Sequence, residues 1–221
     1  MALTEYFTFN LFQERCSVVS DCDGNCAIID PGFSTPQEKD ELYSFIQKKN
    51  LQIKAVLLTH GHFDHIYGVA EAAGRYGVPV YMHPADEVII KEANPMLCNT
   101  YGLVIPDGFT DAVAVKEGDV IKIGNLNFEV IETPGHTPGG VCYLERNKKI
   151  LFSGDTLFAG SIGRTDNQWA DYDALMSGIF TKLMELDGDI TVIPGHGPET
   201  TIATERTTNP FLMPFNEPFE D

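Results

Sequence analysis

A short segment of this chain concentrates residues that bind metal ions. His60, His62 and His65 lie together with Asp64, although the whole chain has only six histidines. The segment directly follows the apolar run 53–58, so these side chains stand where a predicted strand ends. Residues two apart in an extended chain project to the same side, which lets His60 and His62 face one point. Asp64 and His65 approach from the start of the next predicted helix. Imidazole and carboxylate groups at this spacing indicate a metal site.

Three further polar side chains stand in turns that contain Gly or Pro and follow predicted strands: His136, Asp155 and His196. Ends of strands at one edge of packed sheets converge, so we expect four such turns to meet at one place. The seven side chains exceed the four ligands of a closed structural zinc site, and none is a cysteine. They suffice for two divalent ions with positions left for water and substrate. The alternative interpretation is that these seven are scattered polar residues in turns with no common role. It is disfavoured, because five of the six histidines fall at strand ends.

The remaining sequence supplies the elements that position these turns. Strands are predicted at 6–12, 16–20, 27–29, 53–58, 78–82, 120–123, 126–131, 141–144, 150–152 and 190–193. Helices are predicted at 36–49, 64–76 and 172–186, with a short one starting at Pro84. Residues 93–112 show no clean period and predict a long loop, which either walls the site or packs on the surface. This order indicates an α/β (α+β) fold of two mixed sheets packed face to face with helices outside, in one domain over 1–221.

The overall charge excludes several classes of partner. The net charge is −17 and the pI is near 4.6, and such a surface repels nucleic-acid phosphates and anionic membranes. The chain opens with no signal-peptide pattern, and no apolar run approaches the roughly 18 residues of a membrane span. The five cysteines form no disulfide framework. We therefore expect a cytoplasmic protein with no nucleic-acid or membrane partner, and its oligomeric state stays open.

The pattern of ligand residues resembles the metallo-β-lactamase fold superfamily, and within it the glyoxalase II (hydroxyacylglutathione hydrolase) group in a short form without the C-terminal helical domain. The segments 59–65, 133–140, 154–166 and 194–197 carry this resemblance. It implies a four-layer αββα sandwich and two divalent metal ions, with Zn²⁺ first and iron or manganese as alternatives. The implied ligands are His60, His62 and His136 for the first ion, Asp64, His65 and His196 for the second ion, and Asp155 for both.

The resemblance also implies a reaction and its residues. A metal-bridging hydroxide would attack a small-molecule thioester, such as S-lactoylglutathione or a related acyl thioester, with Asp155 and Asp64 as catalytic residues. Arg164 resembles a substrate-binding basic residue of the group, and its alternative role is an ion pair with an acid such as Asp166. The chain departs from the group where Gly197 follows His196 in place of a tyrosine, and where the tail 209–221 lacks Lys and Arg.

Two other functions compete with this one. The segment 163–166 also resembles part of the iron persulfide dioxygenases, which are oxidoreductases that hold a single iron. The turn 194–197 is of the hydrolase type and favours hydrolysis. A third hypothesis, a metal-binding protein without activity, requires the open coordination positions to be idle. His83 lies outside the cluster, and we expect it to have a structural role.

Overall fold

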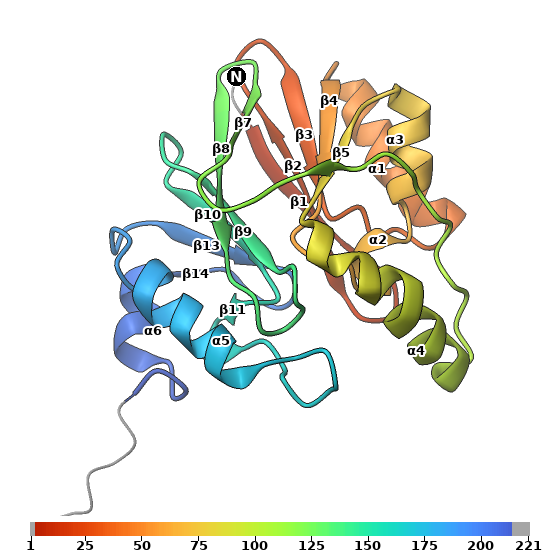
Figure 1. The fold of residues 1–221 in the computed structure, drawn as a ribbon. Helices are drawn as coiled ribbons and strands as arrows, with labels where there is room; N and C mark the ends of the chain where they lie inside the picture. Colours follow the sequence, from red (N-terminus) through yellow and green to blue (C-terminus); the bar gives the residue numbers. More distant parts are fainter. Residues whose placement is uncertain (1–2, 214–221) are drawn as a thin grey trace, which may run out of the picture.

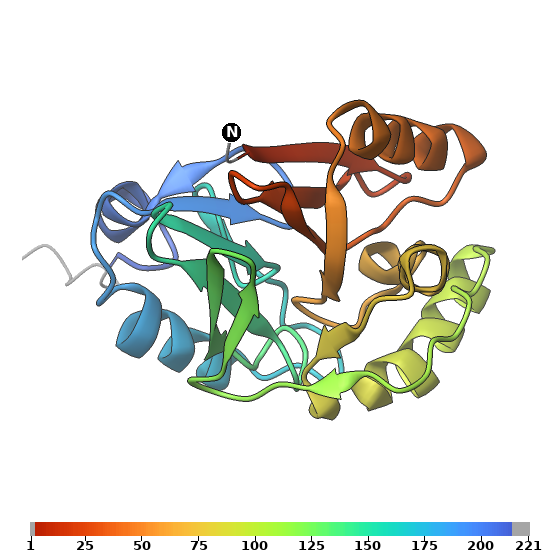
Figure 2. The same ribbon diagram turned by 90° about the horizontal axis from the view of Figure 1, so that it is seen from above.

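The computed structural model describes residues 3–213 and consists of two six-stranded mixed sheets that face each other, with helices on their outer sides (Figure 1 and Figure 2). The predicted four-layer architecture is confirmed. The first sheet has the order β1 (Leu3–Phe9), β2 (Glu14–Ser20), β3 (Asn25–Ile29), β4 (Gln52–Leu57), β5 (Val80–Met82) and β6 (Val113–Ala114). The second has the order β14 (Thr200–Thr201), β13 (Thr191–Pro194), β10 (Ile150–Gly154), β9 (Val141–Glu145), β8 (Leu126–Glu132) and β7 (Val120–Ile123).

A small ribbon and a set of short helices complete the fold. The ribbon pairs β11 (Leu157–Phe158) with β12 (Ser161–Ile162). The α-helices are α1 (Pro36–Lys48), α2 (Phe63–Ile66), α3 (Val69–Tyr76), α4 (Asn94–Tyr101), α5 (Tyr172–Gly178) and α6 (Ile202–Thr208). A 3₁₀ turn covers Pro84–Asp86, and π-helical turns cover Ile89–Ala93 and Ile179–Leu183. Among residues 3–213, no helix has the length and apolar character that a membrane crossing requires.

The core lies in three layers, one between the sheets and one under each set of helices. Alternation along the strands produces this arrangement, because successive side chains of a strand point to opposite faces. In β2, Val19 packs between the sheets while Val18 packs under α1 and α3. In β8, Phe128 and Val130 face the first sheet and are fully buried. Burying one such large apolar side chain contributes roughly 1.5–3 kcal/mol. The core therefore holds the strands firmly, and with them the turns at the strand ends.

The predicted helix over 64–76 is wrong as a single element. It splits into α2 and α3 at Gly68, whose N–H donates to the carbonyl of Pro31 at 2.8 Å. A Cβ at Gly68 would lie 2.3 Å from Cε1 of Phe33, so only glycine lets the chain pass this ring. The break separates the turn of α2, which carries Asp64 and His65, from the longer helix behind it.

The predicted loop over 93–112 is also wrong in its first half. A π-helical turn runs directly into α4, and Gly102 in the left-handed region (φ 67°) ends that helix. Pro95 hid this helix from pattern analysis, yet the chain accommodates it as the second residue of α4, directly after the π-helical turn. Residues 103–112 are irregular. Strands β6 and β14 and helix α6 were not predicted either.

Candidate metal centre

All seven predicted ligand side chains lie at one end of the sandwich. The strands and helices that deliver them come from both sheets, and each side chain stands just beyond a strand or in the short helix α2. The first sheet supplies His60 after β4, then His62, Asp64 and His65 at α2, whereas the second supplies His136 after β8, Asp155 after β10 and His196 after β13. The expectation that the four turns converge is met by the structure.

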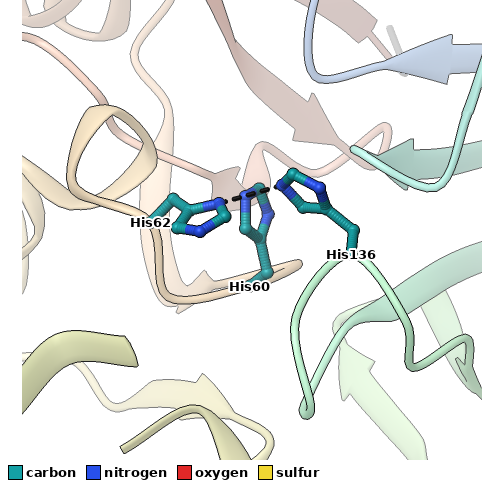
Figure 3. A group of neighbouring side chains, drawn as sticks. All are labelled: His60, His62 and His136. Atoms are coloured by element: carbon teal, nitrogen blue, oxygen red, sulfur yellow. Dashed lines mark hydrogen bonds between the residues drawn. The ribbon is translucent and has the colours of Figure 1, made fainter. Parts of the chain in front are cut away.

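Three histidines form the first group of the centre (Figure 3). One ring nitrogen each of His60, His62 and His136 lies within 4.8 Å of the others. Nε2 of His136 is 2.9 Å from Nδ1 of His62. The rings of His60 and His62 stand edge to face with centroids 4.9 Å apart. Two loops separated by 74 residues in sequence therefore present imidazoles to one point.

The second group consists of Asp64, His65 and His196, whose ligand atoms also lie within 4.8 Å of one another. Nε2 of His196 is 3.3 Å from Oδ2 of Asp64 and 3.2 Å from Nε2 of His65. The turn that carries His196 is held against β2, because the N–H of Arg15 donates to the carbonyl of Gly195 at 2.8 Å.

Asp155 lies between the two groups. Its Oδ1 is 3.5 Å from Nε2 of His65, and its Oδ2 is 3.5 Å from Nε2 of His136 and 3.6 Å from Nε2 of His196. Gly195 makes room for it, since a Cβ there would lie 2.3 Å from Oδ1 of Asp155. Its Oδ2 therefore faces side chains of both groups and its Oδ1 faces the second group, a position that would allow this carboxylate to be shared between two cations.

The polar atoms at the centre of this cluster match the needs of divalent cations. Nε2 of His60 and Oδ1 of Asp155 are buried and have no hydrogen-bond partner among residues 3–213. A buried polar atom without a partner costs about 1–3 kcal/mol, so a cation that both atoms could bind would remove a real penalty. Imidazole and carboxylate are suitable donors for Zn²⁺, Fe²⁺ and Mn²⁺. The residues therefore fit two metal ions.

The outer nitrogens of four histidines are held by neighbouring groups at 2.9–3.1 Å. The partners of Nδ1 are Thr59 Oγ1 for His60, Asp30 Oδ2 for His65, the Arg164 carbonyl for His136 and the Phe12 carbonyl for His196. Such contacts fix ring orientation and aim Nε2 into the centre. His62 is the exception, because it turns Nδ1 inward toward His136.

The environment sets different charge states for different side chains of the centre. Burial opposes the charge of His65 and of His196, but the carboxylates of Asp155 and Asp64 outweigh it and raise the pKa of both imidazoles, so a cation must displace a proton there. Burial, followed by the neighbouring imidazoles, lowers the pKa of His60 and of His62 well below the usual value. Neutral imidazoles keep a lone pair for a cation. Burial opposes the charge of Asp64, but His65 and His196 outweigh it and lower the pKa of that carboxyl. The carboxylate is therefore ionised at neutral pH.

One supporting residue escaped the sequence analysis. The Asp30 carboxylate accepts hydrogen bonds from the N–H of Thr59 at 2.8 Å, from Oγ1 of Thr59 at 2.6 Å, and lies 3.1 Å from Nδ1 of His65. Asp30 directly follows β3 and lies in the left-handed region (φ 49°), at a turn that the sequence does reveal as Asp-Pro-Gly. An Asp at a strand end was the available signal.

Arg164 contributes its main chain to the centre, whereas its side chain is exposed. The guanidinium binds the Asp166 carboxylate at 2.7 and 3.1 Å, which is the ion pair weighed as its alternative role. Substrate binding by Arg164 stays a prediction. His83 has the expected structural role, since its ring accepts from the N–H of Ala85 and contacts Glu132.

Comparison with known proteins agrees with this geometry. The chain matches the family model of the metallo-beta-lactamase superfamily over residues 10–196. It is 40% identical to the hydroxyacylglutathione hydrolase GloC of Haemophilus influenzae, over 94% of this chain and 97% of that protein. Among solved structures it is similar to the BLEG-1 B3 metallo-beta-lactamase (TM-score 0.88, 34% identity, 96% and 100% of the two chains). It is also similar to TTHA1623 in a di-iron-bound form (TM-score 0.84, 37% identity, 94% and 100%).

Proposed function

The chain belongs to the metallo-β-lactamase superfamily, and on that premise we propose that this metal-dependent hydrolase cleaves thioesters such as S-lactoylglutathione or a related acyl thioester. The observation that carries the proposal is the convergence of seven histidine and aspartate side chains from both sheets on one buried centre. The similarity to a hydroxyacylglutathione hydrolase supports the choice of a thioester.

The two groups of side chains divide the ligands between two ions. His60, His62 and His136 would hold the first ion, and Asp64, His65 and His196 the second, with Asp155 shared. A pair of divalent cations, when bound, lowers the pKa of water and polarises the carbonyl under attack. Zn²⁺ suits these donors, with iron or manganese as alternatives.

Side chains of the protein itself position the two ligand groups and orient proton donors at the centre. Asp155 faces both ligand groups and fixes their separation. The Asp64 carboxylate is ionised and lies 3.3 Å from Nε2 of His196, so its Oδ2 can accept a hydrogen bond and orient a proton donor at the centre. A thiolate leaves without protonation, so hydrolysis of a thioester to an acid and a thiol needs no strong general acid. A reaction that needs no general acid suits this centre, because the Asp64 carboxyl is ionised and has no proton to donate.

A cavity beside the centre offers room for a small molecule. Its volume is about 460 Å³, and it is walled by the β1–β2 turn, by the start of α1 with the residues before it, by Tyr67 and Glu71, and by the segment 103–107. Phe12 lines the cavity, and its carbonyl also accepts from Nδ1 of His196 at 2.9 Å. We assign the part of the substrate remote from the thioester to this cavity, whose wall combines apolar side chains with polar ones, among them Lys39 in an ion pair with Glu71 at 3.3 Å.

The proposal is tested by thioester turnover on protein of known metal content. S-lactoylglutathione and acyl thioesters of smaller thiols are incubated with the enzyme, and the released thiol is measured with a thiol dye. We expect about two ions per chain and thiol release that disappears in chelator-stripped protein and returns with added metal. His196→Ala serves as the inactive control. Absence of thiol release from every thioester would contradict the proposal.

A mononuclear iron persulfide dioxygenase is the second candidate, favoured by the segment 163–166. Its prediction differs in both metal content and reaction. It requires a single iron per chain and oxygen consumption with glutathione persulfide. Asp64, His65 and His196 place one ligand atom each within 4.8 Å of the others and so form a second group that could hold an ion. This second group favours the two-ion hydrolase.

A further inference from the structure

Asp86 is a buried carboxylate that belongs to neither ligand group. It ends the 3₁₀ turn Pro84–Asp86 and is 0% exposed. It accepts three hydrogen bonds: from the N–H of Gly61 at 2.7 Å, from Oγ1 of Thr137 at 2.9 Å and from the N–H of Gly139 at 2.6 Å. A charged group so deeply buried is retained only where its partners are well placed.

These three donors belong to the two turns that form the first ligand group. Gly61 lies between His60 and His62, and Thr137 directly follows His136. One carboxylate therefore connects a turn of the first sheet to a turn of the second. The two turns are distant in sequence, so no local structure sets their separation.

The peptide of Gly61 is held from its other side as well. Its carbonyl accepts a hydrogen bond from Nδ2 of Asn94 at 2.8 Å. Asn94 stands where the π-helical turn Ile89–Ala93 passes into α4. A π-helical turn changes the direction of side chains along a helix and often marks a functional site. Both polar atoms of the Gly61 peptide are thus bound by the segment 86–94.

Close packing leaves these contacts little freedom. A Cβ at Gly139 would lie 2.7 Å from the backbone nitrogen of Asp86, and one at Gly61 would lie 3.2 Å from Cβ of Asp86. A shift of Asp86 therefore moves both turns. Ligands held in place before binding give higher metal affinity, because ordering them costs nothing at the moment of binding.

We propose that Asp86 is a positioning residue that sets the distance between the His60–His62 turn and the His136 turn, and so the affinity for the first metal ion. The role rests on the proposed two-metal function. Asp86 touches neither ligand group directly, so it acts through the backbone of Gly61 and Gly139 and through the hydroxyl of Thr137.

The test measures metal affinity in Asp86→Asn by titration against a competing chelator, in the full chain. The amide would turn an N–H₂ group toward a donor and break at least one of the three contacts. We expect roughly 10–100-fold weaker binding of one ion and little change for the other, the range seen for groups that orient metal ligands. The ion whose binding weakens in Asp86→Asn should be the one that weakens in His136→Ala, and not the one that weakens in His196→Ala.

Asp21→Asn is the matched control. Asp21 is 3% exposed, accepts hydrogen bonds from main-chain N–H groups and also joins the two sheets, through Asn125 at 3.0 Å. It lies beyond the other end of β2, far from the centre. We expect a lower Tm and unchanged metal affinity in this variant. Equal metal affinities in Asp86→Asn and Asp21→Asn would overturn the role of Asp86.

A second pair of variants keeps the test valid if Asp86→Asn fails to fold. Thr137→Val removes one hydrogen bond to Asp86, and Thr137→Ser keeps it. We expect a smaller weakening of the same ion in Thr137→Val and wild-type affinity in Thr137→Ser. Equal affinity in these two variants would also overturn the proposal. A wild type that binds no metal would contradict the proposed function itself.

Discussion

The two ends of the sandwich each contain a buried aspartate that joins the sheets, but they use it differently. At the end near the N-terminus (Figure 1), Asp21 binds the turn between β7 and β8. At the other end, Asp86 binds the turns that carry histidines. Burial opposes the charge of Asp21, yet its hydrogen bonds prevail and lower its pKa to about 2. At Asp86 burial prevails and raises the pKa.

This difference shows how stability and function divide between the ends. The carboxylate of Asp21 is satisfied by neighbouring protein groups, because Asn25 and Asn125 donate to it. At the site end, polar atoms such as Nε2 of His60 remain without a protein partner among the described residues. Substitutions at the far end should therefore change stability alone, and those at the site end should change metal binding and turnover.

The largest effect is expected for Asp155→Asn. The amide keeps the size of the side chain but removes the charge that faces both ligand groups. We expect turnover to fall by more than the roughly 100-fold typical of groups that merely orient ligands. Steady-state kinetics with the best thioester would measure this change. An unchanged kcat would show that Asp155 does not join the two groups.

Asp30→Asn is expected to have the next largest effect. Its carboxylate orients His65 directly and His60 through Thr59, so its loss should weaken metal affinity by about 10–100-fold. Chelator competition measures the affinity. If the variant binds metal as tightly as the wild type, Asp30 does not orient the ligands and has only a structural role, as Asp21 does.

Asp21→Asn should lower the free energy of unfolding by about 1–3 kcal/mol. The folded pKa is below the unfolded value, so the stabilisation is present above about pH 4 and disappears as the pH falls through about 2. Denaturant unfolding of metal-stripped wild type and variant, at pH 7 down to pH 2, measures the difference. A difference that grows toward low pH would contradict this assignment.

The smallest effect on stability is expected for Arg164→Ala. The ion pair with Asp166 is exposed and contributes little, so Tm should not change measurably. The Arg164 carbonyl that holds His136 remains, and metal binding should be unchanged. If the guanidinium binds substrate, KM should rise about tenfold with kcat nearly constant. Asp166→Ala, which frees the guanidinium, is the matched control and should not raise KM.

Much of the fold could be predicted from the sequence, because alternation in segments such as 126–131 reports which strand face is buried. The failures have a common cause. The break at Gly68 comes from the ring of Phe33, which lies far along the chain, and no local pattern reports that contact. The helix α4 was missed because proline usually breaks a helix, whereas here the helical run accommodates Pro95 where the π-helical turn passes into α4.

The sequence by itself determined which side chains could bind metal, since histidines and aspartates at the ends of apolar runs are visible without a structure. Only the tertiary structure decided that His62 turns Nδ1 inward, that Asp155 lies between the groups and that Asp86 connects two turns. The physical reason is that ligand identity is local chemistry. Ligand geometry depends instead on how two sheets pack, through contacts between residues far apart in the chain.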